Sequence, residues 1–309
     1  MKKYQDKIIL SIAFTFFAVS GATLLFDIRA FDVGDDIDRE IIGYIQNKNN
    51  LVKRKHDGGL SWDDVGNKEE VYLNDQVFTH SKSTTDIRLN DQTLIKVAPN
   101  SLLKLEKDSS GMKVDLMDGF MFAKLGKGAK GLNIKSGDKT ISATSSNAEF
   151  QISDGNVTVT KGQLALNIDG KQIVVNKNQY LNLLEGRVKN YDILLISPKN
   201  QGKVFFKESS SIFFEWKTKR KSNSFKLFVA KDSKFKEILQ TKDVSKTNAY
   251  MMNLPEGPYY WKVLGTDLVK KEMIVSPSSL FTLKVDRAPK LFFPSKDAEI
   301  LGLKQSNGE

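Results

Sequence analysis

Apolar and polar residues alternate in short runs over most of the chain after residue 40. The runs DIRL and LIKV, which flank NDQT at residues 90–93, are one example. Comparable groups recur at Leu103 and Leu105, Val114 and Leu116, Phe120 and Phe122, Val157 and Val159, and Leu164, Leu166 and Ile168. Alternation with a period of two, broken by Asn, Asp, Gly and Ser, is typical of strands joined by turns. The pattern therefore predicts a mainly β fold with strands of about four to seven residues.

The stretch DDIDREIIGYIQNKNNLVKRK at residues 35–55 fits two patterns. Its isoleucines at positions 37, 41 and 45 are spaced by four residues, as on one face of a helix. Gly43 and the Asn-rich turn at residues 47–50 instead favour a hairpin with strands around Tyr44-Ile45 and Leu51-Val52. We expect the hairpin.

One long apolar run interrupts this β pattern near the amino terminus. Residues 8–26 read IILSIAFTFFAVSGATLLF and carry no charge. At a rise of about 1.5 Å per residue, a helix of this length just crosses a hydrocarbon layer of roughly 30 Å. The run therefore predicts a transmembrane helix over residues 8–26.

The charges on either side of this run predict its orientation. Lysines at positions 2, 3 and 7 precede it and aspartates at positions 27, 32, 35, 36 and 38 follow it, a pattern typical of a cytoplasmic amino terminus. We expect a cytoplasmic tail at residues 1–7, an acidic linker at 27–40 and a periplasmic remainder, in a single-pass protein of the inner membrane. The alternative is a cleaved signal peptide and secretion, since Ser20-Gly21-Ala22 offers small residues to a signal peptidase. The apolar residues that continue to Phe26 favour the uncleaved anchor.

Composition narrows the function classes. The 309 residues exceed one ordinary domain, so we expect two folded units. The chain has no cysteine, which excludes disulfides, thiolate metal sites and a cysteine nucleophile. Its net charge of +10 could attract anionic wall polymers or lipid headgroups. Because the cations are spread along the chain and the protein is expected to be exported, we predict no nucleic acid partner.

The candidate motifs for chemistry are weak. GKGAKG at residues 126–131 has the spacing of a dinucleotide loop, but a strand pattern follows it where a helix is required, so we expect a hairpin loop. The acidic segment at residues 32–40 lacks the glycine and the final glutamate of a calcium loop. His56 and His80 stand alone in polar turns and are expected at the surface. The sequence therefore predicts no catalytic, cofactor-binding or metal-binding residue, no cofactor and no enzyme.

The chain also contains aromatic residues that could stack on sugar rings. The strand patterns predict that four of them fill the core of a β-sandwich, namely Trp216, Trp261, Tyr259 and Tyr260. For Trp62, both a core position and a sugar-stacking position stay possible.

Residues 50–185 resemble the FecR domain in the order of their turns and strands. The resemblance continues through DGFMFAKL, ISATSSNAEFQI and VTVTKGQLAL, although Ser146-Asn147 stands where the family usually has Gly-Thr. The matching positions in the first half are Trp62, Asp75, Val77, Thr79, Ser83, Leu89, Asp91, Pro99, Ser101, Leu103 and Leu105. The resemblance implies a mainly β envelope domain, which we place at residues 41–186. The best known members are anti-sigma regulators with a cytoplasmic domain that holds a sigma factor.

A second module resembles a fibronectin type III or immunoglobulin-like sandwich. Residues 190–286 carry an early core tryptophan and the late strand GPYYWKV, as such modules do. ILLISPKNQGKV then recurs as KLFFPSKDAEI, so residues 287–309 are expected to start an incomplete second sandwich or to form a tail.

These features predict a binding protein. We expect a non-enzymatic, membrane-anchored sensor, adaptor or scaffold that contacts another envelope or membrane protein. One alternative is a peptidoglycan or glycan-binding module of the envelope. The other is an anti-sigma-type regulator that works with a separate cytoplasmic partner, because a seven-residue tail offers far less than the roughly 800 Å² per side of a specific interface.

Overall fold

The computed structural model describes residues 39–144, 148–153, 155–168, 170–206, 211–251 and 254–286, and in these ranges every regular element is a strand. The all-β prediction is confirmed for this part of the chain. The predicted tail 1–7, membrane helix 8–26, most of the linker 27–40 and the segment 287–309 lie outside the described residues. Among the described residues, no helix is long and apolar enough to cross a membrane.

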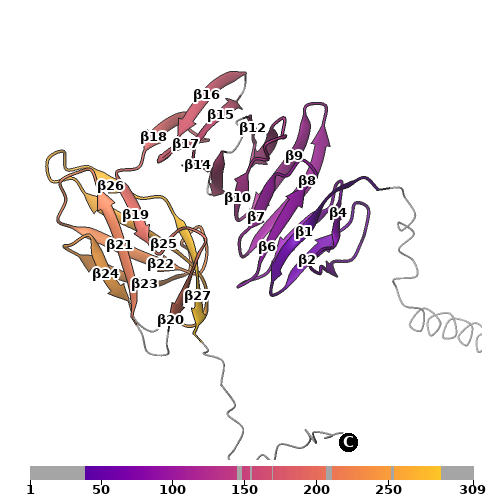
Figure 1. Ribbon diagram of the computed structural model, residues 1–309. Coiled ribbons are helices and arrows are strands. Elements are labelled where there is room, and N and C mark those ends of the chain that lie inside the picture. The colour runs from indigo at the N-terminus through magenta and orange to yellow at the C-terminus, as the bar shows by residue number, and fades with distance from the viewer. Residues whose placement is uncertain are drawn as a thin grey trace, which may run out of the picture.

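The first eighteen strands form two nine-stranded sheets (Figure 1). Sheet 1 has the order β18-β17-β14-β13-β10-β7-β6-β1-β4. Its strands are β1 (Ile41–Asn49), β4 (Glu70–Tyr72), β6 (Thr84–Leu89), β7 (Leu94–Val97), β10 (Phe120–Lys124), β13 (Glu149–Ser153), β14 (Asn156–Lys161), β17 (Gln179–Asn182) and β18 (Arg187–Asn190).

Sheet 2 has the order β16-β15-β12-β11-β9-β8-β5-β2-β3. As in sheet 1, strands from the end of this half of the chain lie at one edge and strands from its beginning at the other. Its strands are β2 (Val52–Lys55), β3 (Asp63–Asp64), β5 (Gln76–Thr79), β8 (Ser101–Asp108), β9 (Gly111–Asp118), β11 (Leu132–Ser136), β12 (Lys139–Ala143), β15 (Gln163–Ile168) and β16 (Lys171–Asn176). All neighbours in it run antiparallel except β9 and β11, which are parallel.

One continuous apolar core lies between sheets 1 and 2. It follows directly from the alternation in the sequence: β6 and β7 form the expected hairpin, with Ile87 opposite Ile95 and both side chains fully buried. The core draws on nearly every strand of both sheets. Its burial supplies the main favourable free energy of this half, because no disulfide is possible.

The predicted hairpin between Tyr44 and Val52 is wrong, although both strands exist. β1 pairs with β4 and β6 in sheet 1, whereas β2 pairs with β3 and β5 in sheet 2. Asn50, with φ of 58°, turns the chain from one sheet to the other. The local pattern showed where the strands are but could not show that their partners are distant in sequence.

Several of the polar residues that carry the family resemblance anchor these crossings. The hydroxyl of Thr79 donates to Ala98 O at 2.5 Å and accepts from Ser101 N at 3.0 Å. Ser101 Oγ accepts from Phe120 N at 3.0 Å, where Gly119 carries the chain from sheet 2 to sheet 1. A Cβ on Gly119 would lie 2.3 Å from Ser101 Oγ, so only glycine fits this crossing.

The remaining strands form a β-sandwich. Sheet 3 has the order β19-β21-β24, and sheet 4 has the order β20-β27-β25-β22-β23, with β26 beside β25. Their bounds are β19 (Ile193–Ser197), β20 (Gly202–Phe206), β21 (Ile212–Thr218), β22 (Phe225–Ala230), β23 (Ile238–Val244), β24 (Asn248–Met251), β25 (Gly257–Thr266), β26 (Met273–Val275) and β27 (Ser279–Val285).

The sandwich has its own aromatic core. Trp216 and Trp261 are fully buried in it, as predicted, and Tyr259 lies beside them. Phe214 meets the Trp261 ring edge-to-face, with centroids 5.1 Å apart. Burial raises the pKa of Tyr259 to about 12.

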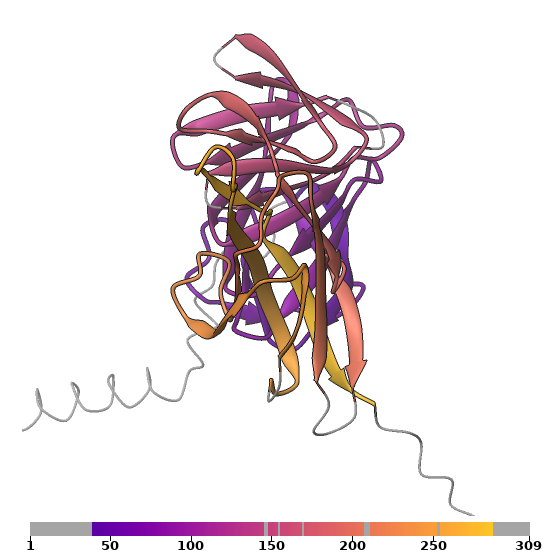
Figure 2. The same cartoon turned by 90° about the vertical axis from the view of Figure 1, so that its left-hand side faces the viewer.

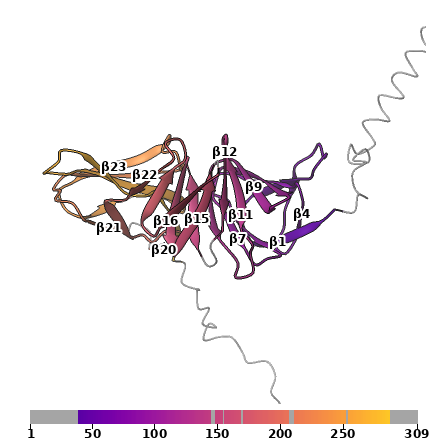
Figure 3. The ribbon, with the colours of Figure 1, turned by 90° about the horizontal axis from the view of Figure 1, so that it is seen from above.

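The sandwich lies against the outer face of sheet 1. Figures 1 and 3 show β19–β27 on one side of the molecule and β1–β10 on the other, with the strands from β14 to β18 joining them. Figure 2, seen from the sandwich side, shows the sandwich strands in front of the two nine-stranded sheets. This placement brings the outward side chains of sheet 1 opposite those of sheet 4.

Candidate functional site

A small apolar cluster fastens the sandwich to sheet 1. Met121 and Ala123 of β10 point into the core, so Phe120 and Phe122 point to the opposite face. The Phe120 ring meets the Tyr260 ring edge-to-face at 5.7 Å between centroids. The other members of the cluster are Ala98, Ala230, Phe235 and Leu280, all buried. Tyr260 was predicted in the sandwich core, but it lies in this contact between the two units.

Polar contacts continue this seam. Gln151 on β13 is 2% exposed, and its amide nitrogen donates to Ser278 O at 3.0 Å. Asn200 Nδ2 donates to Gln151 Oε1 at 2.7 Å, and Leu280 N donates to Asn200 Oδ1 at 3.0 Å. Two residues of the sandwich therefore hold the two ends of the Gln151 amide, which fixes the register of the contact.

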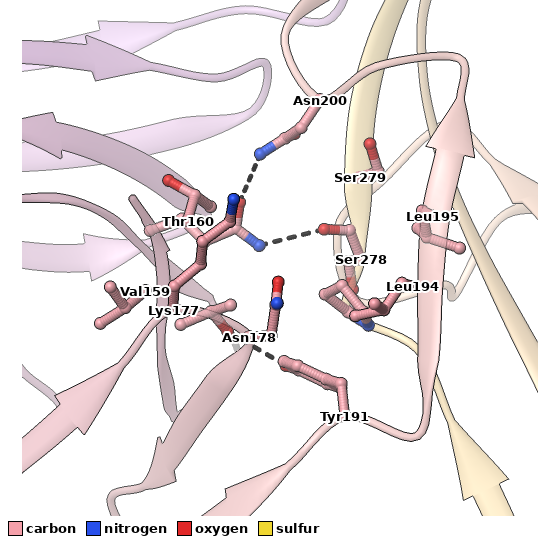
Figure 4. A pocket seen from close by; sticks show the side chains of 13 residues that line it. Val159, Thr160, Lys177, Asn178, Tyr191, Leu194, Leu195, Asn200, Ser278 and Ser279 are labelled. Carbon is pink, nitrogen blue, oxygen red and sulfur yellow. Dashed lines mark hydrogen bonds between the residues drawn. The ribbon is translucent and has the colours of Figure 1, made fainter. Parts of the chain in front are cut away.

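A pocket of about 230 Å³ lies beside this bridge (Figure 4). Thr158 and Tyr191 form part of its wall through a hydrogen bond of 3.0 Å between their hydroxyls, and burial raises the pKa of Tyr191 above its usual value. Figure 4 shows the amide of Asn178 directed into the pocket. Ser279 is 3% exposed, and its hydroxyl has no hydrogen-bond partner among the described residues. The pocket wall therefore combines these hydroxyl and amide groups with the apolar side chains of Val159, Leu194 and Leu195.

Two further hollows extend this pocket into a groove along the outer face of sheet 1. The middle hollow, of about 550 Å³, shares Thr160, Lys177 and Asn200 with the pocket. It shares Lys96, Phe122 and Gln201 with the last hollow, of about 480 Å³. We call the three hollows together the interdomain groove, because sheet 1 forms one wall and sandwich residues the other.

The interdomain groove is basic. Its lining contains seven lysines and two carboxylates, namely Lys48, Lys96, Lys124, Lys161, Lys177, Lys203 and Lys284 with Asp86 and Glu149. Glu149 lies 3.4 Å from Lys124 and 3.6 Å from Lys161, so it is shared between two cations. Lys96 lies 3.9 Å from Asp86. The sequence showed these cations as scattered, because their strands are far apart in the chain.

His56 is not isolated, contrary to the sequence-based expectation. Its Nδ1 lies 2.7 Å from Oδ1 of Asp75, which is fully buried and also accepts a hydrogen bond from Tyr72 N at 2.9 Å. Arg54 Nε lies 3.9 Å from the other oxygen of Asp75. Asp75 thus ties β2 to the turn before β5, a structural task that spacing in the sequence could not reveal.

His80 and Trp62 lie in a row of aromatic rings on sheet 2. The Phe78 ring is 4.7 Å from the His80 ring and 6.1 Å from the Trp62 ring, both in edge-on geometry. Trp62 and His80 are half-buried, and His80 Nε2 is buried without a hydrogen-bond partner in the described part of the chain. His80 is therefore not the freely exposed residue that its turn predicted.

The GKGAKG segment connects β10 of sheet 1 to β11 of sheet 2 and is not a hairpin loop. A strand follows it, as expected, and no phosphate-binding helix. A Cβ on Gly126 would lie 2.1 Å from Asp91 O, so the glycine is explained by close packing.

The prediction that the chain binds no metal can be compared with the structure only over the described residues. No group of three or more His, Asp or Glu side chains that could hold an ion occurs among the described residues. Most of the acidic segment 32–40 lies outside them.

One side of the sandwich presents two sheet edges. β23 ends sheet 4 and β24 ends sheet 3, and a shallow hollow between them is lined by Leu239, Gln240, Thr241, Lys242, Tyr250 and Met251. Ile238 is 43% exposed and Tyr250 is 56% exposed. We call this surface the β23/β24 edge.

Comparison with known proteins finds one family match, within the two nine-stranded sheets. Residues 75–189 match the family model described as FecR protein, which confirms the FecR resemblance for this part of the chain. No curated protein matches the chain. A crystal structure of a candidate anti-sigma factor from Parabacteroides distasonis is similar, with 11% identity, 47% of this chain and 85% of that chain covered, and a TM-score of 0.31.

A second similar structure is the extracellular domain of a candidate one-component system from B. thetaiotaomicron. The identity is 11% and the TM-score 0.21, with 67% of this chain covered. The similarity spans 36% of that longer chain.

Proposed function

We propose that this chain is a non-enzymatic envelope protein, anchored in the inner membrane through residues 8–26, that acts as a sensor or adaptor by binding another envelope protein. The FecR match over residues 75–189 supports a regulatory binding role. The apolar run and its flanking charges support the anchor and the periplasmic placement of the β units.

The observation that carries the binding role is the β23/β24 edge. β23 pairs with β22 on one side only, so its other edge presents backbone N–H and C=O groups. Its seven residues span about 23 Å at roughly 3.3 Å per residue, enough to receive an extended segment of another protein. Among the strands that end the four described sheets, β23 is the longest.

The side chains around this edge include exposed apolar groups, which favour contact with a partner protein over exposure to water. Tyr250 packs against Phe213 at 5.0 Å between centroids while more than half of its surface stays exposed. Exposed edges are usually protected by charges, but β23 carries only Lys242 and Asp243. Lys242 donates to Tyr250 O at 2.7 Å, so it bridges the two edges and leaves Ile238 open. Strand addition by a partner would satisfy the free backbone groups and cover these apolar side chains.

The test is site-specific photo-cross-linking in intact cells. A photoreactive amino acid at position 250 of the full-length protein is expected to capture one reproducible envelope protein. The same probe at position 184 is the control, because Leu184 is 90% exposed on the turn between β17 and β18, far from β23 in the topology. Capture of the same set of proteins from both positions would overturn the proposal.

A pair of variants separates recognition from general surface chemistry. Ile238→Asp with Tyr250→Asp, combined with a probe at position 241, is expected to abolish the captured band. Leu60→Asp with Leu184→Asp changes two leucines that are each 90% exposed elsewhere and should leave the band unchanged. Equal capture by both double variants would show that β23 does not hold the partner.

A further inference from the structure

The interdomain groove concentrates positive charge that the sequence disperses. Its seven lysines against two carboxylates account for a net excess of five positive charges, within a chain whose total is +10. The lysines come from both walls: Lys96, Lys124 and Lys161 from sheet 1, and Lys203 and Lys284 from sheet 4. A groove with charge of one sign on both walls raises the local concentration of oppositely charged ligands.

The groove is long. It extends from Asn47 on β1 to Lys177, which lies two residues before β17, and β1 and β17 are six steps apart in sheet 1. At about 4.8 Å between strands, the groove spans about 29 Å across the sheet. This length suits an extended polymer better than a single small anion.

Its other lining groups favour a sugar chain. Between the lysines lie hydroxyl and amide side chains that can exchange hydrogen bonds with sugar hydroxyls, including Asn47, Asn49, Thr84, Thr160, Gln201 and Thr282. Phe122, 7% exposed, lies at the junction of two hollows and offers an apolar patch on the floor. Single-stranded nucleic acids are bound by rows of exposed aromatic rings, and this lining has no such row.

The pocket at one end adds a fixed polar site. The unpartnered, buried hydroxyl of Ser279 and the amide of Asn178 lie in its wall, next to Lys177. Gln151 is held in place by Ser278 and Asn200, so it shapes the pocket wall. A terminal sugar could enter here while the remaining chain follows the lysines.

We propose that the interdomain groove binds an extended acidic glycan. Carboxylates or similar anions along the glycan lie against the lysines, and its hydroxyls meet the amide and hydroxyl side chains between them. The proposal does not depend on the β23/β24 edge, whose lining residues are separate from those of the groove.

The test measures binding of the full-length protein in detergent to polygalacturonate oligomers, with a neutral glucan of equal length as comparison. Tight binding of the acidic oligomer, weakened as salt rises, and no binding of the neutral one are expected. Equal binding of both glycans would overturn the proposal. A poly-glutamate peptide of equal charge that binds as tightly as the acidic oligomer would overturn the assignment to a glycan.

Matched lysine variants locate the site. Lys48→Gln, Lys177→Gln and Lys203→Gln together remove three cations spread along the groove, and none of these lysines forms an ion pair within the described part of the chain. We expect affinity for the acidic oligomer to fall about tenfold, as three exposed charge contacts would give. The control changes Lys217, Lys221 and Lys246, exposed residues outside the groove, to Gln and alters the total charge equally.

The two triple variants give opposite results only if the groove is the site. Unchanged affinity in the control with loss in the groove variant supports the proposal. Equal losses in both would mean that total charge alone attracts the glycan, and would overturn it. Thermal unfolding of both variants verifies that each remains folded.

Discussion

Phe120 of β10 and Tyr260 of β25 meet edge-to-face, with ring centroids 5.7 Å apart and planes inclined by 65°. The two rings come from opposite halves of the chain and are both buried. Their contact is the centre of the cluster that fastens the sandwich to sheet 1. The groove walls depend on this contact, because one wall comes from each unit.

Phe120→Ala should detach the sandwich without unfolding either half. Removing a buried phenylalanine costs about 3 to 5 kcal/mol in a core, and Phe120 does not belong to the core between sheets 1 and 2. Small-angle scattering should show a larger radius of gyration, and calorimetry should resolve two unfolding transitions. Phe205→Ala is the matched control, since Phe205 is 65% exposed and its loss should change stability by no more than about 0.5 kcal/mol. An unchanged scattering curve for Phe120→Ala would contradict this role.

The docked arrangement should loosen slightly in acid. Lys234 donates a hydrogen bond to Asp118, and this bond holds the pKa of Asp118 below its usual value. A lowered pKa in the folded state means that the stabilisation is present above the unfolded pKa of about 4 and is lost as pH falls through the folded value. Because Asp118 is 58% exposed on its side chain, the effect should be below about 1 kcal/mol.

The measurement is the radius of gyration and the unfolding midpoint between pH 2 and 6, for the native chain and for Asp118→Asn. The native chain should lose a small part of its docking stability below pH 4, and the variant should lack that part of the pH dependence. Identical pH profiles would show that the Asp118–Lys234 bond does not contribute.

Asp75→Ala should destabilise the two nine-stranded sheets by about 2 to 4 kcal/mol. The carboxylate is fully buried and accepts from Tyr72 N and pairs with His56, so its removal leaves both without a partner. Urea unfolding followed by tryptophan fluorescence measures the loss. Asp57→Ala removes an exposed carboxylate one residue after His56 and should change stability by less than about 0.5 kcal/mol. Similar losses in the two variants would argue against a special role for Asp75.

The predicted anchor can be tested by fractionation. We expect the full-length chain in the membrane fraction, resistant to high-salt and carbonate washes, and a variant that lacks residues 2–26 in the soluble fraction. Intact mass should show the complete amino terminus. A mass that corresponds to cleavage near Ala22 would show a signal peptide instead and would contradict the anchor.

Much of the local structure could be predicted from the sequence. The alternation in residues 84–97 gave the hairpin of β6 and β7, and the strand positions of Trp216 and Trp261 gave their burial. These successes share one cause: side chains alternate with a period of two whatever the strand pairs with, so each local pattern records which face is buried. The sequence identified Thr79 and Ser101 as positions that match the FecR domain. The structure shows what they do, since their hydroxyls form hydrogen bonds with the backbone where the chain crosses between the two sheets.

The sequence by itself determined the β composition, the FecR resemblance, the lack of cysteine chemistry and the apolar run at residues 8–26. Only the tertiary structure decided which strands are neighbours, which separated the expected hairpin of β1 and β2 into two sheets and gave His56 its partner. It also brought Lys96, Lys161 and Lys203 to one groove and placed Tyr260 against Phe120. The physical reason is that strand pairing and docking join residues far apart in the chain, and such contacts leave no periodic mark in the local order of residues.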